Sequence, residues 1–111
     1  NHLNLTQQQV ADMAKIPLGS VERYTITMTP IGLSNLRDTR WYVKVRARQE
    51  ITIDKKNAIC IDKDTYDIFV DTNLIGKGEI KMRLYIDIID SDYIEGLRPQ
   101  VVDYITGDSV V

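Results

Sequence analysis

The chain has 111 residues, of which 43% are hydrophobic and 27% charged, and its formal net charge is −2 at pH 7. This size and composition predict one globular domain, and no apolar run reaches the ~18 residues that a membrane-spanning helix needs. The slightly acidic balance argues against a general nucleic-acid binder, because such proteins usually carry a basic surplus.

The opening stretch, residues 5–24 (LTQQQVADMAKIPLGSVERY), has the apolar spacing of a DNA-reading helix-turn-helix. A capping-box pattern at Thr6 predicts a short helix over residues 5–15. A DNA reader needs a second helix after the turn, but residues 24–27 (YTIT) alternate in the manner of a strand. We therefore expect residues 1–20 to form a helix or arm that leads into the first strand. This arm would dock on its own domain or on a neighbouring subunit, and DNA binding is the less favoured alternative.

From residue 21 onward the dominant period is two, which is typical of strands with one face in the core. The clearest strand covers residues 79–88, and others are expected around residues 24–28, 41–48 and 66–70. The side chains expected to face the core are Tyr24, Ile26, Met28, Trp41, Val43, Val45, Ala47, Tyr66, Ile68, Val70 and the even positions from Ile80 to Ile88. Long helices between the strands are missing. The pattern therefore predicts an all-β, antiparallel sandwich or barrel over residues 21–111.

Clusters of Gly, Pro, Asn and Asp punctuate these strands and predict turns. The expected turns lie at residues 30–32, 54–57, 62–64, 73–78, 90–96 and 107–108. Pro99 places its segment at a sheet edge or a bulge, because proline cannot donate a ladder hydrogen bond. Cys60, between Ile59 and Ile61, is expected to be a small buried hydrophobe. A lone cysteine cannot form an intramolecular disulfide.

Charge is unevenly distributed along the chain. Residues 37–56 hold seven basic and three acidic side chains, whereas the residues after 57 hold eleven acids and five bases. A candidate interaction face alternates with the core positions of residues 41–48 and comprises Tyr42, Lys44, Arg46 and Arg48. Such a face suits a single-stranded nucleic acid or an anionic glycan. Pairing within the sheet is favoured instead, and the acids available for it are Glu79, Asp87 and Asp103.

No catalytic or metal-binding constellation is visible in the sequence. With His2 as the one histidine and Cys60 as the one cysteine, a hydrolytic triad or a zinc site is not expected. Two acidic turns offer oxygen ligands to calcium, namely Asp62 with Asp64, and Asp90 with Asp92 and Glu95. Neither follows the EF-hand pattern, and we expect their side chains to bond their own backbone. The chain is therefore predicted to need no cofactor and to catalyse no reaction.

A family resemblance covers the second half of the chain. It rests on DTNLIGKGEI, with Gly76 and Gly78, followed by a long strand and the acidic-aromatic turn DIIDSDYIEGLR, with Tyr93, Gly96 and Arg98. This order resembles the immunoglobulin-like N-terminal domains of phage baseplate and tail-fibre proteins, in versions associated with prophages of gut bacteria. Where that family commonly has proline near the turn, this chain has isoleucine, and the first twenty residues fall outside the resemblance.

The resemblance implies an immunoglobulin-like β-sandwich with a structural role. The expected function is a non-enzymatic assembly module of the virion, which forms homo-oligomers or docks on other tail and baseplate proteins. Gly76, Gly78, Tyr93, Gly96 and Arg98 would shape its turns. The alternative is a carbohydrate-binding sandwich, motivated by the tyrosines and by Trp41, although Trp41 has the parity of a core residue.

Overall fold

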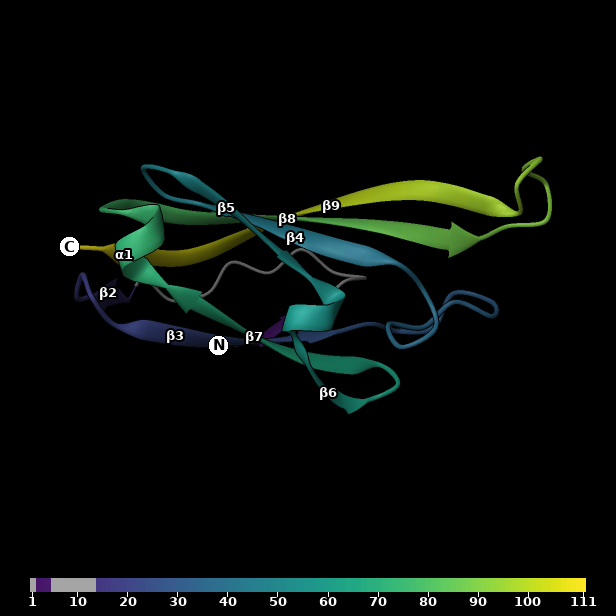
Figure 1. Cartoon of the computed structure of the whole chain (residues 1–111), viewed down its shortest axis with the longest axis horizontal. Coiled ribbons are helices and arrows are strands. Elements are labelled where there is room, and N and C mark those ends of the chain that lie inside the picture. The colour runs from purple at the N-terminus through teal and green to yellow at the C-terminus, as the bar shows by residue number, and fades with distance from the viewer. Residues whose placement is uncertain (1, 5–13) are drawn as a thin grey trace.

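The computed structural model describes residues 2–4 and 14–111, which form two packed β-sheets (Figure 1). In spatial order, the four-stranded sheet contains β1 (His2–Asn4), β3 (Val21–Thr27), β7 (Thr65–Asp71) and β6 (Ile59–Asp62). The five-stranded sheet contains β2 (Lys15–Ile16), β9 (Leu97–Val110), β8 (Gly78–Ile89), β4 (Trp41–Arg46) and β5 (Glu50–Asp54). Two short helical segments, η1 (Lys55–Asn57) and α1 (Thr72–Ile75), connect strands. The predicted all-β sandwich is confirmed.

The chain passes repeatedly between the two layers. After β3 it enters the five-stranded sheet for β4 and β5, returns for β6 and β7, and crosses again for β8 and β9. The pairs formed by these seven strands are antiparallel. Parallel pairing occurs where β1 meets β3 and where β2 meets β9. The two described parts of the N-terminal segment therefore add one strand to each sheet.

The core lies between the sheets and is built by strict alternation. In β4 the burial pattern alternates buried and outward residues, and in β8 every even position from Ile80 to Ile88 is buried. The other predicted core positions are buried as well, with Ala47 packed at the margin. Trp41 joins the layers, because its ring packs edge-to-face on Tyr66 at 5.1 Å and its Nε1 donates to the Leu36 carbonyl at 2.9 Å. Period two in the sequence therefore predicted the core.

The expected helix over residues 5–15 falls mostly outside the described residues. Where the description resumes, Lys15–Ile16 is a strand and Val21–Thr27 is another. These strands occupy the place that the second helix of a DNA reader would need. Of the described residues, no helix is long or apolar enough to cross a membrane.

Two sequence expectations are wrong. Cys60 is exposed, because β6 is an edge strand that pairs on one side with β7. Gly107 and Asp108 form no turn, since they lie inside β9 at a shift of register opposite Glu79 to Lys81. Gly107 takes φ +76° there, which is typical of a bulge, and buried Asp108 accepts a hydrogen bond from the Tyr24 hydroxyl at 2.6 Å.

Pro99 lies at an edge, as predicted. Its segment of β9 pairs with β8 on one side, while β2 reaches only Ser109 and Val110 on the other. The missing N–H of proline therefore leaves no gap between two described strands.

Candidate interaction surfaces

The predicted interaction face lies on the outer side of the five-stranded sheet. Tyr42, Lys44 and Arg46 project outward from β4 because the residues between them fill the core. Arg48 lies beyond the end of β4, in the bend before β5, where its backbone N–H donates to the Ile75 carbonyl at 2.8 Å. The structure therefore brings three of the four predicted residues onto one strand face and places Arg48 beside α1.

Two further cations complete this face. Arg83 of β8 lies directly opposite Lys44, and Lys81 lies directly opposite Arg46. We call Lys44, Arg46, Lys81 and Arg83 the basic quartet. Sequence reasoning missed Lys81 and Arg83, although both stand at the outward odd positions of the predicted strand. The missing information was the register that sets β8 against β4.

The quartet is only partly neutralised. Arg83 pairs with Asp103 through Nε and Oδ1 at 2.5 Å, and Lys44 Nζ lies 4.0 Å from Glu50 Oε2. The hydrogen bond with Asp103 raises the pKa of Arg83 and lowers that of Asp103. Within residues 14–111, Arg46 and Lys81 form no ion pair. The four cations exceed the two paired carboxylates by two, and Glu79, which lines a hollow with Arg46 and Lys81, is a third acid at the margin of this cluster.

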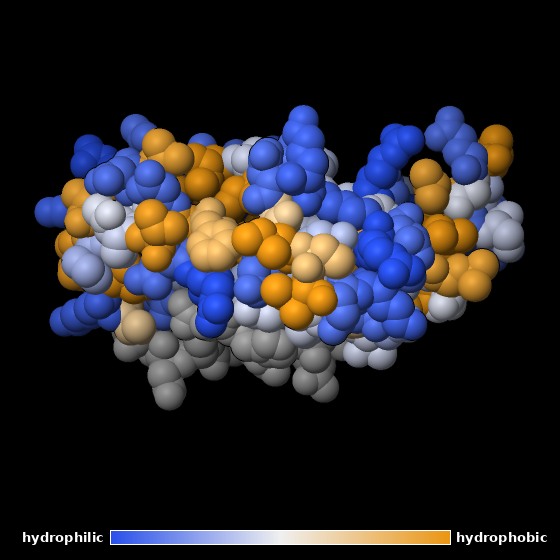
Figure 2. Space-filling view, turned by 60° about the horizontal axis from the view of Figure 1, so that its bottom comes forward, coloured by the Kyte–Doolittle hydropathy of each residue, from blue (hydrophilic) through white to orange (hydrophobic). Residues whose placement is uncertain are grey.

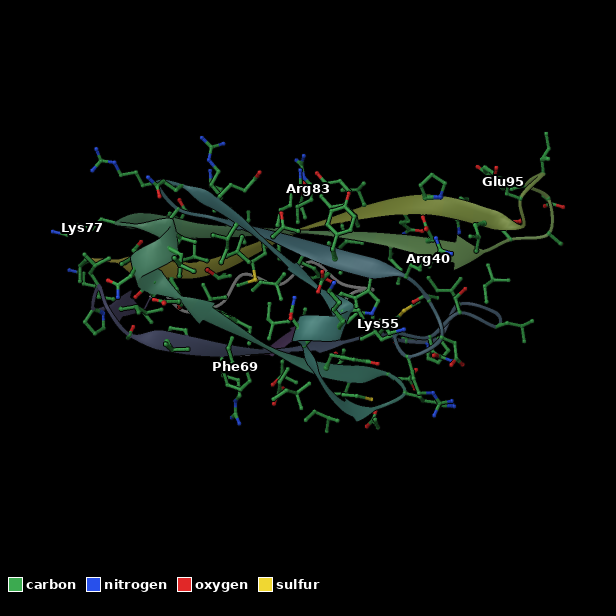
Figure 3. All side chains as sticks on the ribbon, viewed as in Figure 1. Arg40, Lys55, Phe69, Lys77, Arg83 and Glu95 are labelled. Carbon is green, nitrogen blue, oxygen red and sulfur yellow. The ribbon has the colours of Figure 1, made fainter. Side chains whose placement is uncertain are left out.

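An open hollow of about 390 Å³ lies over the quartet. Its lining comprises the quartet with Glu50, Met82, Asp103, Tyr104 and Ile105. Figure 3 shows Arg83 directed away from the opposite sheet, toward solvent. A hollow that combines several cations with some apolar surface suits carboxylate side chains of a partner protein better than a neutral ligand.

The aromatic residues of this face are turned toward each other. Tyr42 and Tyr85 stack with their ring centroids 4.8 Å apart and an angle of 14° between the planes. Lys44 Nζ lies 5.4 Å from the centroid of Tyr85. Each ring therefore covers one face of the other. Trp41 is only 4% exposed, so it offers no platform for a sugar.

The turn residues of the family resemblance lie at the two ends of β8. At the start of β8, Gly76 and Gly78 have φ of +74° and +134°, and a Cβ on Gly76 would lie 3.1 Å from the Arg48 Cβ. After β8, Gly96 has φ +73° and Arg98 Nε lies 3.1 Å from Asp90 Oδ2. These positions have conformations or contacts that fix the turns.

The tip of the β8–β9 hairpin carries the remaining predicted turn residue. Tyr93 is half-exposed there, and its backbone N–H donates to the Asp90 carbonyl at 3.2 Å. Figure 3 shows Glu95 at the same far end of the molecule.

The two acidic turns use carboxylates to hold their own backbone, as expected. Asp62 Oδ1 accepts from the Asp64 N–H at 2.8 Å, and Asp90 Oδ1 accepts from the Asp92 N–H at 3.0 Å. In the described part of the chain, no group of three His, Cys, Asp or Glu side chains is arranged to hold a metal ion.

The outer side of the four-stranded sheet has a different character. Ile59, Ile61 and Phe69 are 52%, 56% and 45% exposed. Figure 2 shows apolar groups gathered across the middle of this face. Exposed apolar groups in one place are typical of protein–protein contact surfaces.

No protein-family model matches this chain, and no curated protein matches it. The fold itself defines the class of protein: a two-layer β-sandwich whose outer faces, one basic and one apolar, both reach solvent.

Proposed function

We propose that this chain is a non-enzymatic assembly module of a phage or prophage tail or baseplate, and that its basic quartet docks on an acidic surface of a neighbouring subunit. The sequence resemblance supports the tail or baseplate setting. The observation that carries the docking surface is the pair of like-charged rungs, Lys44 with Arg83 and Arg46 with Lys81.

Like charges directly opposite each other destabilise a sheet, whereas opposite charges contribute roughly 0.2–1 kcal/mol per pair. A sheet selected for stability alone would alternate the signs at these four positions. An acidic partner offsets the repulsion and leaves the two surplus charges neutralised. The quartet is therefore better explained by a partner than by the stability of the fold.

The strand order supports an immunoglobulin-like form of the sandwich. With β3 as strand B, the sheets follow the order A-B-E-D and A′-G-F-C-C′, which agrees with the arrangement of immunoglobulin domains. Trp41 on β4 corresponds to the buried tryptophan that those domains carry on strand C. The chain departs from antibody domains in two respects: its single cysteine leaves no disulfide between the sheets, and β1 pairs parallel to β3 instead of antiparallel.

The alternatives receive less support. A carbohydrate-binding role needs exposed flat rings, but Trp41 is buried, and Tyr42 and Tyr85 each have one ring face covered by the other. A DNA-reading role needs a second helix in the segment where residues 15–16 and 21–27 form strands.

To test this proposal, the full chain is mixed with the products of the genes adjacent to its own. Complex formation is followed by sedimentation velocity at low and high salt. The variant Arg46→Glu/Lys81→Glu reverses the unpaired half of the quartet, and Arg23→Glu reverses an exposed charge on the opposite sheet. We expect the wild type and Arg23→Glu to bind at low salt and to release at high salt, because exposed charges are screened.

The double variant Arg46→Glu/Lys81→Glu should form no complex through this face, either with a neighbouring protein or with a second copy of itself. A chain that forms no complex with itself or with any neighbouring product contradicts the assembly role. A complex that the double variant forms as tightly as the wild type contradicts the quartet as the docking surface.

A further inference from the structure

β6 is the most exposed strand of the sandwich that the structure describes. It pairs with β7 on one side, and all four of its residues are exposed. Its sequence, ICID, holds two isoleucines and a cysteine. An edge strand leaves a row of unpaired backbone groups, and such a row is a template for pairing with another strand.

The edge of the other sheet is protected by comparison. β5 begins with the charged Glu50, buries Ile53, and has α1 packed against it. Charges and covering helices are the usual devices that keep edge strands apart. The two isoleucines of β6 are more than half exposed, whereas Ile53 of β5 is buried, so β6 is the edge that is more open to pairing.

The apolar surface continues from β6 onto its neighbour. Ile59 pairs with Asp67 of β7, so Phe69, two residues further on, is its diagonal neighbour on the same outer face. Both side chains are about half exposed. On the inner side of the strand lies an open hollow of about 530 Å³, lined in part by Trp41, Cys60 and Tyr66. Apolar surface and room for side chains thus flank the edge on both sides.

The charges at the two ends of β6 indicate which partner fits. Lys56, before the strand, has a side chain that is 82% exposed and lies 3.9 Å from the Asp54 carboxylate, whereas Lys55 beside it is held by the carbonyls of Arg37 and Thr39. Asp62 ends the strand and is exposed. An antiparallel second copy brings the end of β6 that carries Lys55 and Lys56 toward the end of the other copy that carries Asp62 and Asp64, and the two-fold symmetry forms this contact twice. A parallel copy would bring lysine toward lysine.

We infer that two copies of this chain pair antiparallel along β6, with Cys60 opposite Cys60 of the second copy, so that the four-stranded sheet continues from one copy into the other. This inference goes beyond the proposed function, because it concerns the opposite sheet and does not use the basic quartet. The interface is isologous and closed, so it gives a dimer and no filament.

The ladder in this dimer is short. A bulge at Ile61 interrupts the register of β6 against β7, and bulges limit regular pairing at edges. The apolar contacts of Ile59, Ile61 and Phe69 therefore supply most of the binding free energy. We expect a weak dimer whose population depends on protein concentration. Salt should not dissociate it, because the burial of apolar surface is not screened by ions.

The test uses the full chain and the thiol of Cys60 as a reporter. Mild oxidation should give a Cys60–Cys60 disulfide, detected by mass spectrometry, at a rate that rises with protein concentration. The variant Ile59→Lys/Ile61→Lys should lose the reduced dimer in sedimentation velocity. The matched control Val101→Lys, half-exposed on the outer face of the other sheet, should keep it.

Two further measurements keep the outcomes separate. Cys60→Ser should still form the dimer, because the thiol only reports on the contact. Arg46→Glu/Lys81→Glu should also keep it, so that failure of the quartet and failure of β6 give different patterns. Circular dichroism checks that each variant is folded. A wild type that stays monomeric at every concentration under reducing conditions overturns the inference, as does a dimer that survives Ile59→Lys/Ile61→Lys.

Discussion

The two outer faces of the sandwich are built by the same alternation but present opposite chemistry. On the five-stranded sheet, the outward positions of β4 and β8 carry the basic quartet. On the four-stranded sheet, the outward positions of β6 and β7 carry Ile59 and Phe69. Figure 3 shows Arg83 and Phe69 pointing away from the core on opposite sides of the molecule.

This difference separates the residues that the stability of the fold requires from the residues that it leaves free to vary. The inward residues of both sheets are similar in kind, because both sheets must fill one apolar core. The outward residues have no such requirement, so their contrast reflects what each face meets in solution. Changes in the core should therefore alter stability, whereas changes on either face should alter association and leave the free energy of unfolding nearly unchanged.

The largest expected difference in stability between an inward and an outward position is at two neighbouring aromatic residues, Trp41 and Tyr42. Trp41→Ala removes the ring that packs on Tyr66 and the hydrogen bond to the Leu36 carbonyl. We expect the free energy of unfolding to fall by about 3–5 kcal/mol. Tyr42→Ala, one residue further on and outward, should cost much less. Urea denaturation of both variants measures the difference, and equal losses would mean that the outer face is also part of the stabilising structure.

The contact that ties the two sheets together gives the next largest effect. The Tyr24 hydroxyl on β3 donates to buried Asp108 on β9 at 2.6 Å. Tyr24→Phe removes this charge-assisted donor and should lower the free energy of unfolding by about 1.5–3 kcal/mol. Denaturant titration measures it, with Tyr93→Phe at the exposed hairpin tip as the control. A loss below about 0.5 kcal/mol would show that the bond adds little to the joining of the faces.

The core-facing residues could be predicted from the sequence for a physical reason. Alternation in a strand is local, so the parity of Tyr24, Trp41 or Leu84 follows from the neighbouring residues alone. The position of a strand within a sheet is not local. The apolar run around Cys60 therefore looked like core, although it forms an exposed edge.

The candidate surfaces divide in the same way. Tyr42, Lys44 and Arg46 followed from the parity of one strand, whereas Arg48 lies beyond that strand because β4 ends at Arg46. Lys81 belongs to the quartet only through its register with Arg46. Pairing register depends on residues far apart in the chain, and the alternation within one strand excludes slips by one residue but does not select among slips by two.

The bend that separates Arg48 from the quartet depends on a glycine. Gly76 has φ +74°, and a Cβ there would lie 3.1 Å from the Arg48 Cβ. Gly76→Ala should cost about 1–3 kcal/mol from the backbone alone, because φ +74° with ψ −171° is a conformation essentially confined to glycine, and the contact adds to this cost. Gly32→Ala is the matched control, since Gly32 has φ +58° and open space around it. Thermal unfolding should rank Gly76→Ala as the more damaging, and the reverse ranking would mean that Arg48 moves aside without cost.

A stabilising substitution tests directly whether the basic face is kept for a partner or for the stability of the fold. Lys81→Glu turns the like-charged rung with Arg46 into an opposite-charged one. We expect the free energy of unfolding to rise by about 0.2–1 kcal/mol, while docking through the basic face weakens. Lys77→Glu, in the turn before β8, serves as the control for a general change of net charge. If Lys81→Glu lowers stability, the quartet is part of the fold, and its explanation by a partner fails.

The smallest expected effect concerns the ion pair at the margin of the quartet. The hydrogen bond from Arg83 holds the pKa of Asp103 below its ordinary value of 3.8. Because the folded pKa is the lower one, the pair stabilises the fold above the ordinary pKa, and this contribution is lost as the pH falls through the folded value. Both side chains are exposed, so the effect on unfolding is slight.

An NMR titration of the carboxyl carbon of Asp103 detects this shift directly, and Arg83→Gln should return the pKa of Asp103 toward the ordinary value. Asp38 is an internal control, because Asn35 and Arg37 lower its pKa and Arg83 does not. If Asp103 titrates normally in the wild type, Arg83 and Asp103 do not form the ion pair in solution, and this contact adds nothing to the stability of the fold.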